Sequence, residues 1–352
     1  MTLSGSALFV TLTLLLSPTK CAVFENVTLS LSTGWRKLLS SERPPTKIVF
    51  IESSDSLGEY VNLHPLEYVT IADQKIPELK ENSLANLPNK NGVYITSSEV
   101  TKIEPGTFKN VPRLDRVHLD GNRIEEIEDG VFTNLQLRKL YLRNNKISKL
   151  GLAAFSNMTR LEDINLTYNK LSTWSSDWFS GTPVASVYIA HNLIEELPAD
   201  VFAYMFPFKR ISGEISIWNF IISNNRLKKV HTDAFRNVNH FGSLSLSNNS
   251  LENLSPKVFH SVETINHLHL NSNLLSNIDG LFYSIYIYNL HLDDNRLSCF
   301  PSGVFNASDI HRVSINRNPL TCDCVHYWKD QQERSIQLRF NFVYDKEKCV
   351  NI

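Results

Sequence analysis

The chain has 352 residues, with 35 Lys and Arg against 36 Asp and Glu, which gives a formal net charge of −1. A balance this close to neutral lacks the basic surface of a nucleic-acid-binding protein, so no nucleic-acid partner is expected. The length would ordinarily suggest two domains. A regular internal period over most of the chain instead indicates one unit that grows by repetition.

Residues 1–21 have the pattern of a secretory signal peptide. Residues 7–16 (ALFVTLTLLL) form an apolar run, which is too short to span a bilayer as a helix. No second apolar run of about 18 residues follows, so no membrane span is expected. These features predict a chain that is secreted into the extracellular space.

Residues 22–47 are expected to cap the N-terminal end of the repeat array. The stretch from Val27 to Leu31 alternates apolar and polar residues, which is typical of a strand with one buried face. Val49 and Ile51 are interpreted as the start of a first, degenerate repeat.

Residues 48–317 repeat the pattern L-x-x-L-x-L-x-x-N-x-L. Successive asparagines lie 22 to 24 residues apart, except for one spacing of 33, and a Phe follows ten residues after most of them. A fixed period in the range of about 20–29 residues indicates a horseshoe solenoid, here of about 10–11 repeats. The asparagine column is Asn122, Asn145, Asn169, Asn192, Asn225, Asn249, Asn273, Asn295 and Asn318.

Each repeated position has a physical role. The apolar pair of L-x-L, such as Leu140 and Leu142, points inward from a short strand, because side chains alternate across a strand. The Asn closes the following turn by bonding backbone groups, and the Phe fills the core behind the sheet. Gln74 and Ser98 stand at the Asn position in two earlier repeats, as expected for atypical terminal repeats.

The spacing of 33 residues marks an insertion within residues 203–217 (AYMFPFKRISGEISI). Its first half is aromatic and basic. Two interpretations stay open: a bulged loop packed on the solenoid, or a loop that contacts a partner, since insertions in repeat proteins map to loops.

Residues 318–352 are expected to form a C-terminal cap that contains cysteines. If Cys21 leaves with the signal peptide, an even set of four remains, which suggests two disulfides in a secreted chain: Cys299, Cys322, Cys324 and Cys349. Cys299 and Cys322 each follow their repeat's Asn by four residues, so the favoured pairing is Cys299–Cys322 with Cys324–Cys349. The alternative pairing is Cys299–Cys324 with Cys322–Cys349, and a metal site at Cys322 and Cys324 is a third interpretation.

The repeats, together with Asn318-Pro-Leu, the Cys322-x-Cys324 pair and Trp328, resemble extracellular leucine-rich repeat proteins of the typical animal subclass. The resemblance implies an α/β solenoid, a curved horseshoe with a parallel sheet on the concave face and an irregular or short-helical convex side. It also implies protein binding. The chain ends three residues after Cys349, so the cysteine-rich cap is expected to be truncated.

Alternation places three columns of side chains on the concave face. Its N-terminal half combines large aromatic residues with arginines, which are the residue types that anchor protein interfaces. The alternative is an ordinary solvated sheet face. The predicted binding residues are Tyr94, Arg116, His118, Tyr141, Arg143 and Tyr188.

The same columns bring His267, His269 and His291 together further along, with Asp293 beside them. Three interpretations stay open for this cluster: a solvated patch, a pH-sensitive contact and a metal site, because His titrates near neutral pH and binds metals.

Six N-glycosylation sequons agree with secretion. One of them, at Asn165, falls in the middle column of the concave face, where a glycan would obstruct the sheet. The sequons are at Asn26, Asn157, Asn165, Asn248, Asn253 and Asn306.

No nucleophile elbow, phosphate loop or metalloprotease helix is present in the sequence, so no enzyme activity, cofactor or metal is expected. The predicted function is recognition by a secreted protein, in innate immunity or cell recognition; the alternative is a structural component of the extracellular matrix or of adhesion. The expected partners are a protein ligand or receptor, a microbial surface component, or a second copy of the chain.

Overall fold

The computed structural model describes residues 22–33, 46–205, 215–299, 309–334, 339–341, 344–345 and 350–351, with side chains described as far as residue 330. The predicted signal peptide (1–21), the sequon at Asn306, Cys349 and residues 206–214 of the insertion lie outside the described residues. No helix in the described ranges is long and apolar enough to cross a membrane.

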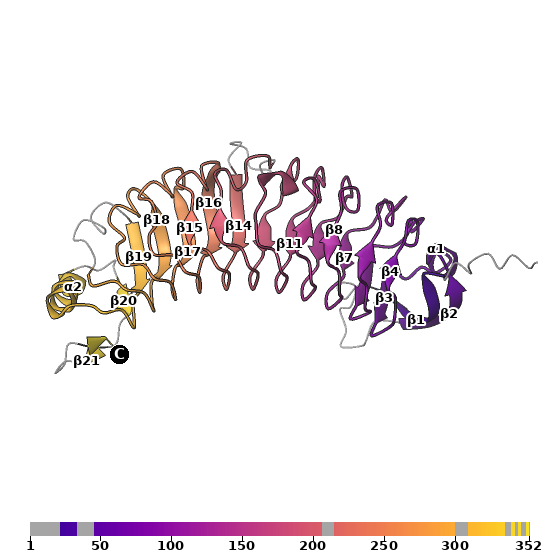
Figure 1. The fold of residues 1–352 in the computed structure, drawn as a ribbon, viewed down its shortest axis with the longest axis horizontal. Coiled ribbons are helices and arrows are strands. Elements are labelled where there is room, and N and C mark those ends of the chain that lie inside the picture. The colour runs from indigo at the N-terminus through magenta and orange to yellow at the C-terminus, as the bar shows by residue number, and fades with distance from the viewer. Residues whose placement is uncertain are drawn as a thin grey trace, which may run out of the picture.

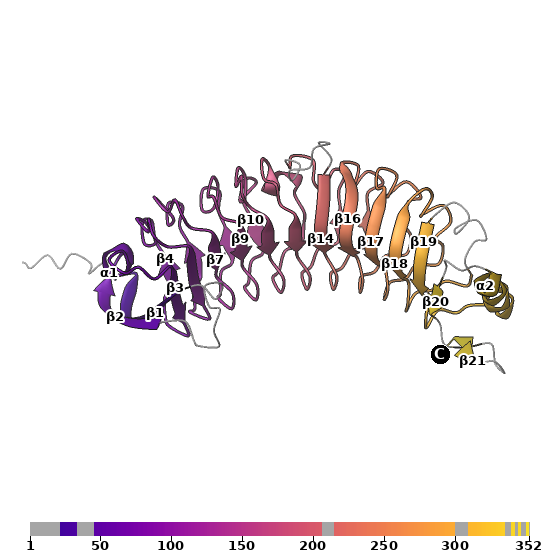
Figure 2. The same cartoon turned by 180° about the vertical axis from the view of Figure 1, so that it is seen from behind.

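The described coils stack side by side into an arch, with β1 and β2 at one end and α2 (Cys322–Arg334) at the other (Figure 1, and from behind in Figure 2). Strands from successive coils join the N-terminal pair β1 and β2 in a 14-stranded sheet in the order β2-β1-β3-β5-β7-β9-β11-β12-β14-β16-β17-β18-β19-β20. The strands span Phe24–Ser32 (β1), Thr46–Ser54 (β2), Tyr68–Ala72 (β3), Gly92–Thr96 (β5), Arg116–His118 (β7), Lys139–Tyr141 (β9), Asp163–Asn165 (β11), Ser186–Tyr188 (β12), Ile215–Ile221 (β14), Val238–Ser245 (β16), Thr264–His269 (β17), Tyr286–His291 (β18), Asp309–Ser314 (β19) and Arg339–Asn341 (β20).

From β3 onward the strands of this sheet are parallel, and residues at the same position in neighbouring repeats pair with each other. Val117 pairs with Leu140, and Leu140 with Ile164, and all three are fully buried. Their neighbours on either side are partly exposed. The predicted horseshoe, with its parallel sheet on the concave face, is therefore confirmed.

The opposite side of the coils is mostly irregular. Short paired strands form there between neighbouring coils, and η2 (Ser176–Phe179) and α1 (Gly58–Val61) are each a single turn. The pairs are β4 (Glu78–Leu79) with β6 (Lys102–Ile103), β8 (Glu126–Ile127) with β10 (Lys149–Leu150), and β13 (Glu196–Leu197) with β15 (Lys229–Val230). Near the C-terminus β21 (Tyr344–Asp345) pairs with β22 (Val350–Asn351).

The asparagine column forms a buried ladder of hydrogen bonds between coils. The Asn145 side-chain oxygen accepts from the backbone N–H of Ile124 at 3.1 Å, and its amide nitrogen donates to Leu119 O and Leu142 O at 2.9 and 3.1 Å. One amide thus satisfies three buried backbone groups, two of them in the preceding coil. Buried backbone groups require such partners, which explains why the turn after each strand carries Asn.

The phenylalanine column forms a spine of packed rings, from Phe108 and Phe132 through Phe155 to Phe179 at centroid separations of 5.6 to 6.2 Å. Trp174 then inserts between Phe179 and Phe202, with ring separations of 6.1 and 6.0 Å. Its indole N–H donates to Val201 O at 3.1 Å. Trp174 stands where other repeats have the buried aliphatic residue of the short outer strand, and residues 172–174 do not form that strand.

The N-terminal end differs from the expected start of the repeats. β2 contains Val49 and Ile51 and pairs antiparallel with β1, and β1 pairs antiparallel with β3. Val49 and Ile51 therefore belong to an antiparallel edge strand rather than to a parallel repeat. The alternating pattern of residues 22–47 does form strand β1, with Val27, Leu29 and Leu31 in the core.

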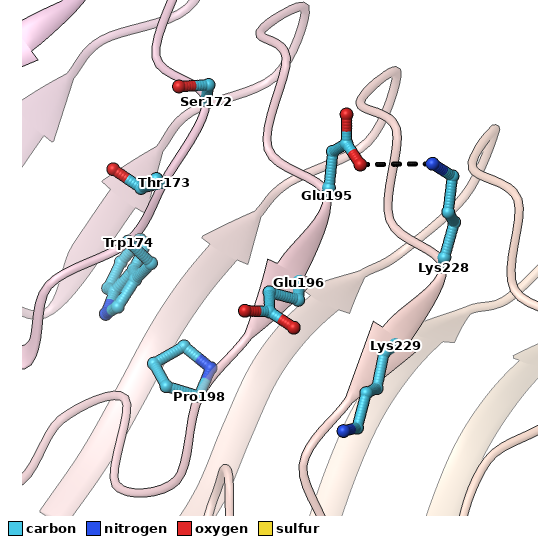
Figure 3. Close-up of a pocket in the computed structure, with 8 residues that line it drawn as sticks. All are labelled: Ser172, Thr173, Trp174, Glu195, Glu196, Pro198, Lys228 and Lys229. Carbon is cyan, nitrogen blue, oxygen red and sulfur yellow. Dashed lines mark hydrogen bonds and ion pairs between the residues drawn. The ribbon is translucent and has the colours of Figure 1, made fainter.

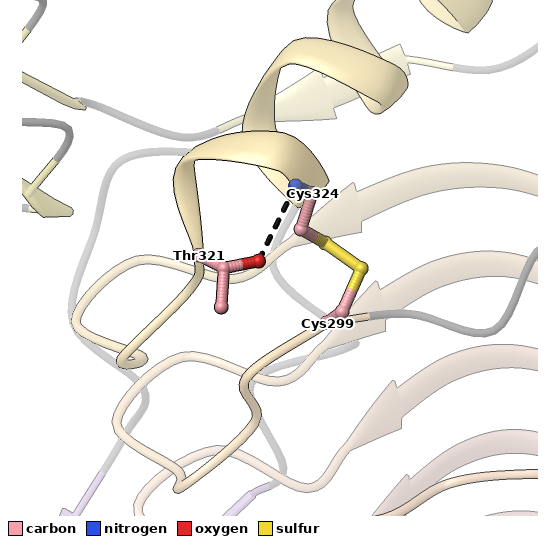
Figure 4. Close-up of a disulfide and its surroundings, with 3 residues drawn as sticks. All are labelled: Cys299, Thr321 and Cys324. Atoms are coloured by element: carbon pink, nitrogen blue, oxygen red, sulfur yellow. Dashed lines mark hydrogen bonds between the residues drawn. A yellow bond between two sulfur atoms is a disulfide. The ribbon is translucent and has the colours of Figure 1, made fainter.

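The favoured disulfide pairing is wrong. Cys299 is bonded to Cys324, with Cα atoms 5.4 Å apart (Figure 4). Cys322 is exposed and forms no disulfide with another described cysteine. The Cys299–Cys324 bond of the alternative pairing is therefore confirmed, while its Cys322–Cys349 bond involves a residue outside the described ranges. The prediction assumed that the chain at 322 continues the path of a regular coil. Helix α2 begins there instead, with the Thr321 hydroxyl accepting from Cys324 N at 3.3 Å. Because residues two apart lie on different faces of a helix, Cys324 faces the last coil and Cys322 faces solvent.

Part of the predicted insertion is regular structure. Residues 215–217 belong to strand β14, where Ile217 is fully buried and pairs with Phe241. At the other end Met205 is buried and Tyr204 is exposed. The extra residues of this repeat therefore lie before residue 215.

Candidate protein-binding surface

Tyr94, His118 and Tyr141 occupy equivalent positions on three neighbouring strands of the concave face. The sheet register pairs Tyr94 with His118 and His118 with Tyr141. The rings follow each other at centroid separations of 4.4 Å in both steps. Tyr68 lies 5.9 Å from Tyr94 but belongs to the preceding column, because it pairs with Gly92. One ring per coil thus gives a continuous aromatic row, held by the backbone pairing of the strands.

Charged side chains flank this row on the preceding column. Lys139 Nζ lies 3.1 Å from Asp163 Oδ2, and the Tyr141 hydroxyl donates to the same oxygen at 3.0 Å. Arg116 Nε donates to Asp115 at 3.3 Å. Burial raises the pKa of Tyr141, as does the Asp163 carboxylate. The tyrosine hydroxyl is therefore a fixed, neutral hydrogen-bonding group at physiological pH.

His118 is uncharged at neutral pH. Burial, together with the nearby charges of Arg116 and Lys139, lowers the pKa of His118 to about 4. Its ring lies 3.8 Å from the carboxylate of Asp120, but this contact is no ion pair at pH 7 because the imidazole is neutral there. The histidine acts as a third aromatic ring in the row.

Arg143 lies outside the row, in the turn after β9. Its backbone N–H donates to Asp120 Oδ1 at 2.7 Å, and its guanidinium carbon lies 5.5 Å from the centre of the Tyr168 ring. Tyr168 in turn stacks on His191 at 4.0 Å. Arg143, Tyr168 and His191 form a second cluster, the turn cluster, which the concave columns alone did not reveal. Tyr168 and His191 each immediately precede an Asn of the column, and that position is the sequence signal for them.

Tyr188 continues the column of Tyr141 but is separated from it by Asn165. Asn165 is half-buried, and its side-chain oxygen accepts from Thr167 N at 2.9 Å. The predicted binding residues thus divide into the aromatic row with Arg116, the turn cluster with Arg143, and Tyr188 beyond the Asn165 sequon.

His267, His269 and His291 come together as predicted, with Asp293 near His291. His269 and His291 stack at 4.5 Å, and burial, with His291 and His267 nearby, lowers the pKa of His269 to about 4. Asp293 accepts bonds from Ser314 Oγ at 2.6 Å and from Asn316 N at 2.8 Å, so its carboxylate is held by the next coil. In the part of the chain with described side chains, no group of three or more His, Cys, Asp or Glu could hold a metal ion.

A pocket of about 610 Å³ lies on the outer side of the coils, beside Trp174 (Figure 3). Its walls include residues 195–196 and 198 and residues 228–229 of the following coil, and Lys228 pairs with Glu195 across it at 3.0 Å. It opens where residues 172–174 do not form the short outer strand. The pocket is therefore a consequence of Trp174 in the spine and is not part of the concave face.

Four of the described sequon asparagines are exposed: Asn26, Asn157, Asn248 and Asn253. Asn165 is only half-exposed, within the concave sheet. The structure therefore leaves room for glycans at these four positions away from the aromatic row.

Family models of leucine-rich repeats match the part of the chain that contains the repeats. Residues 77–209 match the family model described as BspA type leucine rich repeat region (6 copies), and residues 217–275 match a leucine rich repeat model. The chain contains leucine-rich repeats. No curated protein matches the sequence.

Two solved structures share the fold. One is a chain of a crystal structure of a TLR13–ssRNA13 complex, with 19% identity and a TM-score of 0.57 over 78% of this chain and 43% of that one. The other belongs to an octameric complex of Latrophilin 3, Unc5D and the leucine-rich repeats of FLRT2, with 19% identity and a TM-score of 0.52 over 77% of this chain and 89% of that one. This chain therefore spans less than half the length of the first of them.

Proposed function

We propose that this leucine-rich repeat chain is a secreted recognition protein that binds a protein partner on the concave surface around Tyr94, His118 and Tyr141. The observation that carries the proposal is the aromatic row, in which rings from three successive coils lie 4.4 Å apart. Large aromatic side chains that are already ordered lose little freedom on binding, and they are the residues that dominate protein interfaces.

The charges around the row support a protein partner rather than an apolar ligand. Arg116 and Lys139 stand next to Asp115 and Asp163, so the surface presents both signs of charge within a short distance. Such mixed polar rims around aromatic centres are typical of protein interfaces and contribute more to partner choice than to affinity.

The disulfide and the exposed sequons are consistent with the proposed secretion of the chain. The Cys299–Cys324 bond suits an oxidising compartment, and exposed sequons suit an extracellular protein. We place the chain in the typical animal subclass of extracellular leucine-rich repeat proteins, with a C-terminal cap around α2. Its role is in innate immunity or cell recognition, with a protein receptor or a microbial surface component as partner.

The solved neighbours support binding as the common use of this fold. FLRT2 repeats occur in a complex with Latrophilin 3 and Unc5D, and TLR13 occurs in a complex with single-stranded RNA. The near-neutral charge of this chain favours protein over RNA as its own partner.

A capture experiment with the full chain tests the proposal. The immobilised parent, the variant Tyr141→Ala and the control Tyr283→Ala are incubated with extracellular fluid of the source, and retained proteins are identified by mass spectrometry. Tyr283 is exposed outside the concave columns, so its variant controls for loss of any surface tyrosine. A partner held by the parent and by Tyr283→Ala but not by Tyr141→Ala supports the proposal. Equal retention by all three contradicts it.

A further inference from the structure

The concave surface does not end at the aromatic row but continues to the first strand of the sheet. The register pairs Tyr94 with Thr70, Thr70 with Ser30, and Ser30 with Ile48 of β2. Ile48 is 62% exposed and Phe50, two residues on and facing the same way, is 60% exposed. Two large apolar side chains thus stand in solvent at the margin of the sheet.

β2 is also the terminal strand of the sheet among the residues the structure describes. It has nine residues and pairs with β1 on one side, with no further described strand on the other. Edge strands expose unpaired backbone N–H and C=O groups, and monomeric proteins commonly protect them with prolines, bulges or many charges. β2 has no Pro, a single Lys at position 47 and a single Glu at position 52.

We propose that a second copy of this chain pairs antiparallel with β2, so that two horseshoes share one continuous sheet. The exposed apolar pair favours a second copy, because Ile48 and Phe50 lie on one face of β2 and antiparallel pairing of two identical strands can set each beside the other. Lys47 and Glu52 lie near opposite ends of the strand but on opposite faces of the sheet, so the contact between the copies is apolar rather than ionic.

Side-chain alternation limits the registers of this pairing, and burial of the exposed apolar residues favours one of them. If a two-fold axis perpendicular to the sheet relates the two copies, residues that face each other across the two strands must point to the same side of the sheet. One residue of β2 therefore lies on the axis, opposite its own copy. With Val49 at the axis, Ile48 faces Phe50 of the second copy, and Thr46 faces Glu52. The four exposed apolar side chains then form one cluster. With Phe50 at the axis, Ile48 would face a carboxylate.

This dimer is separate from the proposed binding function, but it would change how tightly the chain binds its partner. The exposed face of β2 is the face that carries the aromatic row, so a dimer would carry two rows on one sheet. Two binding sites on one particle raise the apparent affinity for a partner that is itself multivalent or surface-bound.

Sedimentation analysis of the full chain tests the proposal. The parent is expected to show twice the monomer mass, and Ile48→Thr/Phe50→Thr is expected to show the monomer mass at the same concentration. Threonine keeps the preference for strand structure. The matched control is Leu152→Thr, since Leu152 is 68% exposed on the outer side of the array and should leave the dimer intact. Circular dichroism and a thermal melt establish that each variant is folded.

A crosslink tests the register. The variant Val49→Cys should form an intermolecular disulfide on mild oxidation, because a residue on the two-fold axis lies beside its own copy, while the parent reports any link through Cys322. A monomeric parent overturns the proposal and leaves the concave binding site untouched. A dimer that persists in Ile48→Thr/Phe50→Thr also overturns it, as does a dimeric Val49→Cys variant that forms no crosslink beyond that of the parent.

Discussion

The ring of Tyr141 lies 4.4 Å from the ring of His118 in the preceding coil, and the two residues are direct partners in the sheet register. Their contact follows from the repeat period alone, because residues one repeat apart are brought side by side. A solenoid can therefore build a binding surface by placing one suitable residue at the same position in each repeat.

The concave surface can be tested by affinity once a partner is identified. Tyr141→Ala should weaken binding by about 2 kcal/mol or more, roughly thirty-fold in affinity, as is usual for a central aromatic residue of an interface. Surface plasmon resonance against the purified partner measures it. Unchanged affinity in Tyr141→Ala, together with loss of binding in Tyr204→Ala, would place the site at the insertion instead.

Arg143→Ala separates the two parts of the predicted surface. Arg143 contacts Tyr168 in the turn cluster and not the aromatic row. If the partner spans both, Arg143→Ala should lower affinity to a similar degree as Tyr141→Ala, in the same binding assay. An effect of Tyr141→Ala alone would confine the site to the row.

Phe155→Ala should lower the free energy of unfolding by roughly 3–5 kcal/mol, because it empties a large site in the core. Phe155 is fully buried between Phe132 and Phe179. Urea denaturation of the variant, compared with Leu152→Ala at an exposed position three residues earlier, measures the loss. Equal midpoints for the two variants would contradict the role of the spine.

Stability should fall as the pH drops from about 6.5 toward 4. Burial lowers the pKa of both His118 and His269 to about 4, whereas the unfolded chain takes up these protons near pH 6.5. Within this window the unfolded state binds more protons, and acid therefore favours unfolding. Thermal melts at several pH values should show a shallower decline for His118→Phe/His269→Phe than for the parent. Parallel declines would count against buried neutral histidines.

Peptide mapping under non-reducing conditions should recover Cys299 linked to Cys324. Cys299→Ser should lower stability by roughly 3 kcal/mol, as expected for a closed loop of moderate length, while Cys322→Ser leaves that bond in place and serves as the control. Denaturation of both variants measures the difference. A peptide that links Cys299 to Cys322 would show that the helix start at residue 322 does not set the pairing.

The sequence predicted those parts of the fold that depend on the period. The register of the concave columns, the burial of the Asn and Phe columns, and the meeting of Tyr94, His118 and Tyr141 all follow from counting residues along identical repeats. Features at breaks in the period were not predictable in this way. The helix that starts at Cys322 turns Cys324 inward, and the direction of β2 depends on its pairing with β1, which no local pattern encodes.

The turn cluster was missed for a related reason. Strand alternation predicts which side chains lie on the sheet, but Arg143 lies beyond the strand, where the chain enters the turn. Tyr168 and His191 adopt positive φ angles of 58° and 54° in that turn. Their direction is therefore set by the turn conformation and not by the alternation used to assign the face.

The asparagine ladder gives the array a polarity. The side chain of Asn145 completes the backbone of the coil before it, and Asn169 does the same for the coil of Asn145, by accepting from Ile147 N and donating to Leu142 O. The buried backbone groups of a coil therefore lack some of their hydrogen-bond partners until the next coil is in place. During synthesis from the N-terminus, each emerging repeat would supply the hydrogen bonds that the preceding repeat lacks. Assembly of the horseshoe would therefore proceed in the same direction as translation.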